Sequence, residues 1–139
     1  MANGSQAVIA PSEKTKQALI QYGVMAPIYI VPTGLDLSEY DRIGFASGIY
    51  YGKFHQSVLN FASVNLPEYK EVFLICTHGG SAAYQSIETI IKDKHCNVIG
   101  KFSCKGYDTF GPFKLVGGIA KGHPNEKDLT AAMEFYQSL

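Results

Sequence analysis

The chain has 139 residues, 46% of them hydrophobic, and its 12 basic and 12 acidic side chains cancel. This length predicts a single domain over residues 1–139, with a core large enough to fold without disulfides or metals. The balanced charge excludes nucleic acid and membranes as main partners, because both require clustered Lys and Arg. Three cysteines match no zinc or redox spacing, and neither a signal peptide nor a membrane span is found. We therefore expect a cytoplasmic protein.

Short apolar segments alternate with helical patterns along the whole chain. Nearly continuous Ile, Val and Phe predict strands, buried on both faces of a sheet, at 6–10, 27–31, 42–46, 71–76 and 97–103. Helices are predicted after Ser12, Lys53, Ser81 and Asn125, with a short helical turn around 37–40. This alternation predicts an α/β fold: a Rossmann-like five-stranded parallel sheet in the order 2-1-3-4-5 with helices on both faces.

In such a sheet, ligands bind beyond the carboxyl ends of the strands, where the strand order switches between strands 1 and 3. The loops at 10–15, 46–54, 76–81 and 103–113 all follow predicted strands and meet at this edge. They are the places to search for binding or catalytic residues.

Two of these loops combine aromatic residues with glycines. "ASGIYYGKFH" (46–55) brackets two tyrosines with glycines, and "FSCKGYDTFGPFKLVGG" (102–118) repeats the combination after the fifth strand. Glycine lets the backbone approach a flat ligand closely, and tyrosine offers a ring face with a polar tip. The loops therefore suit a planar heteroaromatic ring held between them. Packing of the aromatic side chains onto the domain is an equally good interpretation.

The segment from about 37 to 139 resembles bacterial flavodoxin-like proteins. The motifs "YDRIGFASGIYYGKFHQSVLNF" and "GKFSCKGYDTFGPFKLVGGIAKGHPNEKDL" and their spacing carry the resemblance. It implies a three-layer flavodoxin-like sandwich with a noncovalent FMN site. One face of the isoalloxazine ring would meet Ser47, Gly48, Ile49, Tyr50, Tyr51, Gly52 and Lys53. The other face would meet Cys104, Lys105, Gly106, Tyr107, Asp108 and Phe110, with Tyr50 or Tyr51 and Tyr107 stacking on the ring.

The first third of the chain departs from that family. Its segment "VIAPSEKTKQALIQYGVMAPIYIVPTGLD" (8–36) resembles a β-α-β unit of two-lobed retaining glycosyltransferases. The two resemblances together indicate a chimera in which a glycosyltransferase-like segment (about 1–36) replaces the equivalent flavodoxin unit. Both units are right-handed and parallel, so the exchange is physically reasonable. An engineered origin is the favoured interpretation.

The loop after the first strand would hold the FMN phosphate. Ser12 and Thr15 offer hydroxyl groups, Lys14 offers a positive charge, and the helix N-terminus offers free N–H groups. Against binding, Pro11 lacks an N–H, Glu13 repels phosphate, and the loop lacks glycine. Alternatively, Ser12 serves only as the helix N-cap. We expect FMN to bind more weakly than in an intact flavodoxin, or not at all.

No catalytic residues and no metal site are predicted. Cys76 and His78 lie two residues apart, but no nucleophile-elbow pattern surrounds them. The sequence places polar residues around His55, His95 and His123, which predicts solvent-exposed side chains rather than metal ligands. An electron carrier needs no acid–base apparatus, which agrees with this pattern.

Three functional interpretations follow from the sequence. The first is an FMN-binding electron-transfer module that serves redox partner proteins, with a less negative potential than acidic flavodoxins because this chain is neutral. The alternative is a structural chimera with no cofactor and no activity of its own. The third, a glycosyltransferase fragment, lacks the second lobe and any acidic motif for a sugar nucleotide.

Overall fold

The computed structural model describes residues 6–21, 23–31, 36–105 and 126–139. Its elements in chain order are β1 (Gln6–Ala10), α1 (Glu13–Gln21), β2 (Ile28–Ile30), the 3₁₀ turn η1 (Leu37–Glu39), β3 (Arg42–Tyr50), β4 (Lys53–Phe54), α2 (Gln56–Asn65), β5 (Glu71–His78), α3 (Gln85–Asp93), β6 (Asn97–Lys105) and α4 (Glu126–Ser138). The five parallel strands follow the order β2-β1-β3-β5-β6, and β4 pairs antiparallel with β3. This is the predicted flavodoxin-like order.

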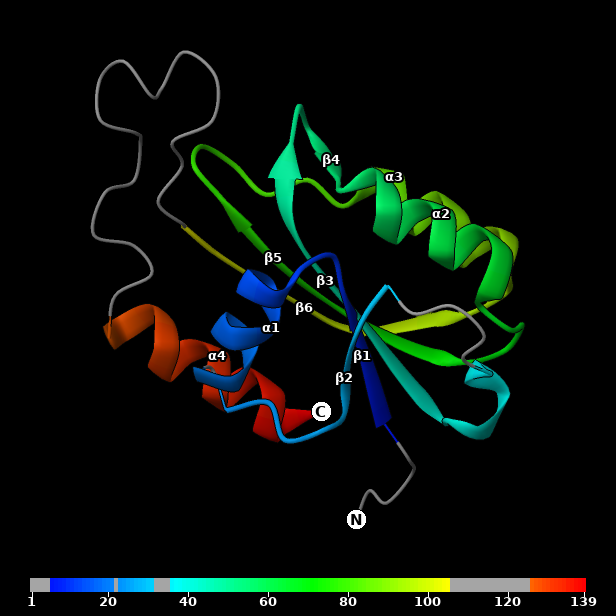
Figure 1. The fold of residues 1–139 in the computed structure, drawn as a ribbon, viewed down its shortest axis with the longest axis horizontal. Helices are drawn as coiled ribbons and strands as arrows, with labels where there is room; N and C mark the ends of the chain where they lie inside the picture. The colour runs from blue at the N-terminus through cyan, green and yellow to red at the C-terminus, as the bar shows by residue number, and fades with distance from the viewer. Residues whose placement is uncertain (1–5, 22, 32–35, 106–125) are drawn as a thin grey trace.

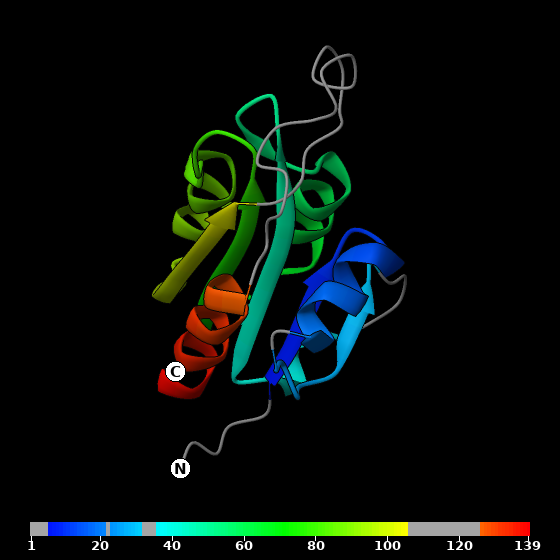
Figure 2. The same ribbon diagram turned by 90° about the vertical axis from the view of Figure 1, so that its left-hand side faces the viewer.

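The sheet lies between two layers of helices (Figures 1 and 2). Helices α1 and α4 cover one face, and α2 and α3 cover the other. On the α2/α3 face, the core is built from buried side chains such as Phe45, Leu74 and Ile87. On the α1/α4 face, Val8 and Phe73 are fully buried. Burial on both faces explains why the central strands β1, β3 and β5 are largely apolar rather than alternating.

Close packing inside the sheet depends on one glycine of β3. Gly44 is the register partner of Phe73 on β5. A Cβ atom on Gly44 would lie 2.4 Å from Cε2 of the Phe73 ring. The fully buried phenylalanine therefore covers the β3 backbone directly, and only glycine leaves it the space.

Three strands are longer than predicted from sequence. β3 continues to Tyr50, β5 to His78 and β6 to Lys105. The extension of β3 has a clear cause, because β4 supplies a hydrogen-bonding partner for its last residues. Polar and aromatic side chains are thus carried on regular strands past the buried core.

Candidate functional site at the carboxyl edge of the sheet

The first part of the site is the start of α1, directly after β1. The Ser12 hydroxyl accepts a hydrogen bond from the backbone N–H of Thr15 at 3.3 Å, and the Ser12 carbonyl accepts from Lys16. Ser12 is therefore the N-cap of α1, as the alternative interpretation held. The Ser12 and Thr15 hydroxyl oxygens also lie 3.3 Å apart, so the two groups predicted to hold phosphate contact each other.

The charged groups of this first turn are exposed. Lys14 is exposed, whereas the Glu13 carboxylate accepts a hydrogen bond from Gln17 at 2.9 Å, one turn along the helix. This carboxylate stabilises the helix through its dipole and lowers the attraction of the helix N-terminus for an anion. One of the free N–H groups at the start of α1 is thus already satisfied by the Ser12 side chain.

The second part is the segment predicted to be a loop over 46–54, and the structure corrects this prediction. The segment is a β-hairpin in which Ile49 pairs with Phe54 and Tyr50 pairs with Lys53. Its turn is made by Tyr51 and Gly52, with φ angles of 52° and 77°. A two-residue turn with two positive φ angles matches the right-handed twist of the paired strands. The sequence signal, a residue followed by glycine between Ile49-Tyr50 and Lys53-Phe54, could have revealed it.

The base of the hairpin is fixed by buried polar contacts. The Ser47 side chain is 3% exposed; its hydroxyl accepts from the backbone N–H of His55 at 2.9 Å and donates to the Gly48 carbonyl at 2.6 Å. The backbone N–H of Phe54 donates to the Ser86 hydroxyl on α3 at 3.2 Å. Both arms of the hairpin are therefore tied to the helices beneath them.

The two tyrosines differ in their surroundings. Tyr50 is 40% exposed and meets the His55 ring edge to face at a centroid distance of 5.2 Å. Tyr51, at the tip, is 86% exposed. His55 is not a solvated surface residue as predicted: it is half-buried, and its Nδ1 atom caps α2 by accepting from the Ser57 N–H at 3.1 Å.

The third part, the loop after β5, was not among the predicted site residues. Helix α3 begins at Gln85 with Tyr84 at its N-cap position, so the predicted cap at Ser81 is wrong. The Tyr84 hydroxyl interacts with the Cys76 thiol and the Ser103 hydroxyl, and the Tyr84 ring contacts Phe54. It thereby joins the hairpin to β5 and β6.

Tyr84 and Cys76 are poor candidates for acid–base or nucleophilic chemistry. Burial raises the pKa of the Cys76 thiol, so the thiol stays protonated near neutral pH. Burial and the neighbouring Cys76 raise the pKa of Tyr84 well above its usual range. The two groups are therefore neutral near pH 7.

At the end of β5, His78 is half-buried and pairs in register with Lys105, the last residue of β6. The Nδ1 atom of His78 is buried and has no hydrogen-bond partner in the described part of the chain. Burial and the charge of Lys105 lower the pKa of His78, so its ring is neutral at pH 7. Buried polar atoms without partners are uncommon in folded proteins, and among the described residues Arg42 Nη1 is a second example.

The predicted site residues after β6 are only partly described. Cys104 is buried against the α1/α4 side, and Lys105 is exposed. Gly106, Tyr107, Asp108 and Phe110 lie outside the described residues, as do His123 and Asn125. Because β5 lies between β3 and β6, the loop after β5 is nearer to the hairpin than the end of β6. The predicted strand order itself could have pointed to His78 and Tyr84.

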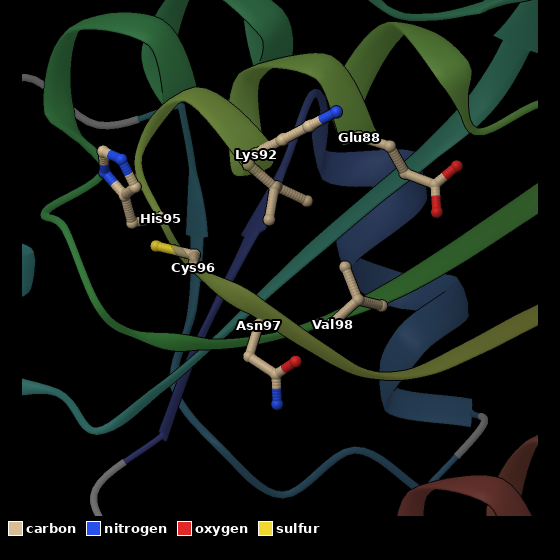
Figure 3. A pocket seen from close by; sticks show the side chains of 7 residues that line it. Glu88, Lys92, His95, Cys96, Asn97 and Val98 are labelled. Atoms are coloured by element: carbon tan, nitrogen blue, oxygen red, sulfur yellow. The ribbon is translucent and has the colours of Figure 1, made fainter.

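A shallow groove of about 560 Å³ lies elsewhere, between the C-terminal end of α3 and the beginning of β6 (Figure 3). Its walls are Glu88, Ile91, Lys92, His95, Cys96, Asn97 and Val98. Glu88 pairs with Lys101 at 2.7 Å, His95 pairs with Glu68 at 3.0 Å, and the Cys96 thiol donates to the Pro67 carbonyl at 3.1 Å. Its main polar groups are thus engaged in structural contacts.

Two further searches bear on function. Among the described residues, no three His, Cys, Asp or Glu side chains are grouped so as to hold a metal ion. No helix in the same part of the chain combines the length and apolar character needed to cross a membrane. The carboxyl edge of the sheet, formed by the ends of β1, β3, β5 and β6, therefore remains the candidate site.

Comparison with known proteins relates the chain to an archaeal protein. No family model matches it. The uncharacterized protein MJ0298 of Methanocaldococcus jannaschii is 41% identical over 107 residues, which span 74% of this chain and 71% of that protein. The chain belongs to the MJ0298 family. The matched protein comes from an archaeon, whereas the sequence motifs resemble bacterial proteins.

Solved structures show the fold of this member of the MJ0298 family to be flavodoxin-like. A Fusobacterium nucleatum flavodoxin bound to FMN superposes with a TM-score of 0.66 at 11% identity, covering 98% of this chain and 96% of its own. A two-electron reduced flavodoxin from Megasphaera elsdenii superposes with a TM-score of 0.57 at 14% identity. This match covers 92% of the present chain and 97% of that flavodoxin. A Lactobacillus acidophilus flavoprotein in complex with FMN superposes with a TM-score of 0.52 at 14% identity. This match covers 73% of the present chain and 93% of that flavoprotein. The first two matches include most of the N-terminal third.

Proposed function

We propose that this chain binds FMN at the carboxyl edge of its sheet and acts as an electron-transfer module. The observation that carries the proposal is the β3–β4 hairpin, which presents Tyr50 and Tyr51 on a base anchored by Ser47. Tyr51 is 86% exposed on a left-handed backbone, a conformation that costs energy for any residue with a side chain. The two-residue turn requires this backbone geometry, and it leaves the Tyr51 side chain exposed at the tip of the hairpin.

The residues around the ring position fit a flavin. The hairpin tyrosines offer aromatic rings for stacking, and His78 and Lys105 place polar groups at the ends of the neighbouring strands. The proposed ring-binding residues on the hairpin are Ser47, Gly48, Ile49, Tyr50, Tyr51, Gly52 and Lys53. On the other side they are Cys104, Lys105, Gly106, Tyr107, Asp108 and Phe110. When bound, FMN supplies the one- and two-electron chemistry that the side chains of the chain lack.

The phosphate position fits less well. Ser12, Lys14 and Thr15 would hold the phosphate at the start of α1, but the Ser12 hydroxyl is engaged as a helix cap. Glu13 adds a negative charge to the same turn. We therefore propose reduced FMN affinity relative to flavodoxins that surround the phosphate with a glycine-rich loop.

The alternative proposal is a structural chimera of flavodoxin-like and glycosyltransferase-like segments without cofactor. Its support is the sequence of residues 8–36 and the glycine-free turn before α1. The comparisons add nothing to it, since the F. nucleatum flavodoxin covers 98% of the chain and so includes this segment in the flavodoxin fold. Under either proposal the chain is one domain over 1–139, with no glycosyl-transfer activity.

Partners and location follow from the first proposal. Electron transfer requires protein partners that reduce and reoxidise the flavin. None of Cys76, Cys96 and Cys104 forms a disulfide, as expected in a reducing compartment, so we propose a cytoplasmic location.

The direct test is a titration of the purified chain with FMN, followed by quenching of flavin fluorescence. The proposal expects saturable 1:1 quenching and a yellow protein. A well-folded, colourless chain that causes no quenching would contradict it and favour the cofactor-free alternative. Saturation at nanomolar FMN would contradict the proposed weakening of phosphate binding but would leave the proposal of FMN binding intact.

A further inference from the structure

One histidine at the carboxyl edge has its protonation state constrained by its surroundings. The Nδ1 atom of His78 is buried without a partner among the described residues, whereas the residue as a whole is only half-buried. Its Nε2 atom is not among the buried unpartnered atoms and takes part in none of the hydrogen bonds described for the chain. The exposed side of the ring is therefore the Nε2 side.

This arrangement selects one tautomer. A proton on buried Nδ1 would have no acceptor and would carry the full desolvation penalty of an unpaired donor. Placing the single proton on Nε2 avoids burying an unpaired donor and leaves only an acceptor at Nδ1. The neutral ring thus presents an N–H donor at the carboxyl edge, and the lowered pKa of His78 agrees with the difficulty of adding a second proton.

The charged neighbour of His78 lies on the adjacent strand. Lys105 is its register partner on β6 and is the group whose charge acts on it. On the other side, β3 places Gly48 opposite Thr77, one residue before His78. The other described titratable groups toward this end are Tyr50, Lys53 and His55 of the hairpin region and Tyr84 before α3. The next cation on β6, Lys101, is already paired with Glu88 at 2.7 Å.

We infer that His78 and Lys105 form the subsite for the electron-rich polar edge of the flavin ring, and that they favour its reduced form. The inference rests on the proposed FMN function. Nε2–H of His78 donates a hydrogen bond to a ring acceptor, and Lys105 supplies positive charge beside it. Uptake of two electrons and one proton from a reduced partner protein turns the neutral ring into an anion. A nearby cation and a neutral donor stabilise the anion more than the neutral ring.

The test compares three variants with the wild-type chain. Lys105→Gln removes the charge, and His78→Phe removes the donor while keeping a flat ring of similar size. Lys101→Gln is the matched control, since it removes a lysine from the same strand whose charge is paired with Glu88. For each, FMN affinity is measured by fluorescence quenching and the midpoint potential by dithionite titration against a dye, with circular dichroism as the check on folding.

The expected result is a lower potential for Lys105→Gln and for His78→Phe. Each variant should lose about three- to tenfold in its preference for reduced over oxidised FMN, the scale of one partly exposed charge or hydrogen bond. Lys101→Gln should keep the wild-type potential. If FMN binds but both variants keep the wild-type potential, the inference is overturned while the proposed function stands. If the wild-type chain does not bind FMN, both are overturned.

Discussion

Replacement of Tyr51 by Asn separates the stability of the hairpin from its proposed function. Tyr51 has a φ angle of 52° and is followed by Gly52 at 77°, the turn geometry that favours Asn-Gly. The left-handed conformation costs about 1–2 kcal/mol for an ordinary residue, and asparagine recovers much of this cost. Because the tyrosine is 86% exposed, little burial is lost. We expect the free energy of unfolding to rise by about 0.5–1 kcal/mol and Tm by about 2–4 °C.

The same substitution should weaken FMN binding. Loss of one aromatic stacking contact is worth about 0.5–1.5 kcal/mol, which corresponds to about two- to tenfold in affinity. Urea denaturation followed by circular dichroism measures the first effect, and fluorescence quenching measures the second. Tyr69→Asn is the matched control, because Tyr69 has a φ angle of 64°, is 77% exposed and precedes β5 at the opposite edge of the sheet.

Two outcomes would refute the reasoning about Tyr51. A destabilised Tyr51→Asn variant would show that the left-handed tyrosine is not strained or that its side chain stabilises the fold. A stabilised variant with unchanged FMN affinity would remove Tyr51 from the ring-binding residues. Tyr69→Asn should leave FMN affinity unchanged, and a loss there would show that the assay reports general damage.

Three other predictions follow from the site. Ser47→Ala leaves the backbone N–H of His55 without its acceptor, so the free energy of unfolding should fall by about 1–3 kcal/mol in urea denaturation. An unchanged stability would contradict the anchoring role of Ser47. Glu13→Gln should strengthen FMN binding about two- to threefold, because it removes a negative charge near the proposed phosphate position. The affinity is measured by fluorescence quenching. Weaker binding would exclude the start of α1 as the phosphate position. His78 has a lowered pKa in the folded state, so the unfolded chain binds more protons below about pH 6.5 and stability should fall as the pH drops below that value. The decline should be shallower in His78→Phe, and an equal slope would contradict the assignment.

Much of the fold could be predicted because the strands are buried on both faces. Strand β1 has the predicted bounds, and the other predicted strands lie within two residues of the observed ones, except that β3 runs on to Tyr50. The right-handed crossover rule then leaves few strand orders, and the observed order agrees with the prediction. The α1 N-cap at Ser12 could also be predicted, since its hydroxyl satisfies a local backbone N–H.

The hairpin could not be inferred from apolar periodicity, because β4 has only two residues. Its existence depends on the turn chemistry at Tyr51 and Gly52 and on the buried Ser47 contact, which only the fold creates. Ser81 resembles a helix cap, but α3 begins only at Gln85, after Tyr84 has made its contacts with Cys76 and Ser103. The tertiary contacts of one tyrosine therefore outweigh a local capping preference.

The role of His78 was missed for a related reason. In sequence it stands near Cys76 and suggests nucleophilic chemistry, but the thiol lies in the core of the α2/α3 face, where burial raises its pKa. What makes His78 significant is its buried Nδ1 atom and its pairing with Lys105, a residue 27 positions away. Neither property is local in sequence.

The measurement that tests the central claim most directly is the titration of the wild-type chain with FMN, followed by fluorescence quenching and the visible absorption spectrum. The account predicts saturable 1:1 binding, weaker than nanomolar, with the absorption spectrum of a protein-bound flavin. A folded chain that leaves FMN fluorescence unchanged at micromolar concentrations would contradict it.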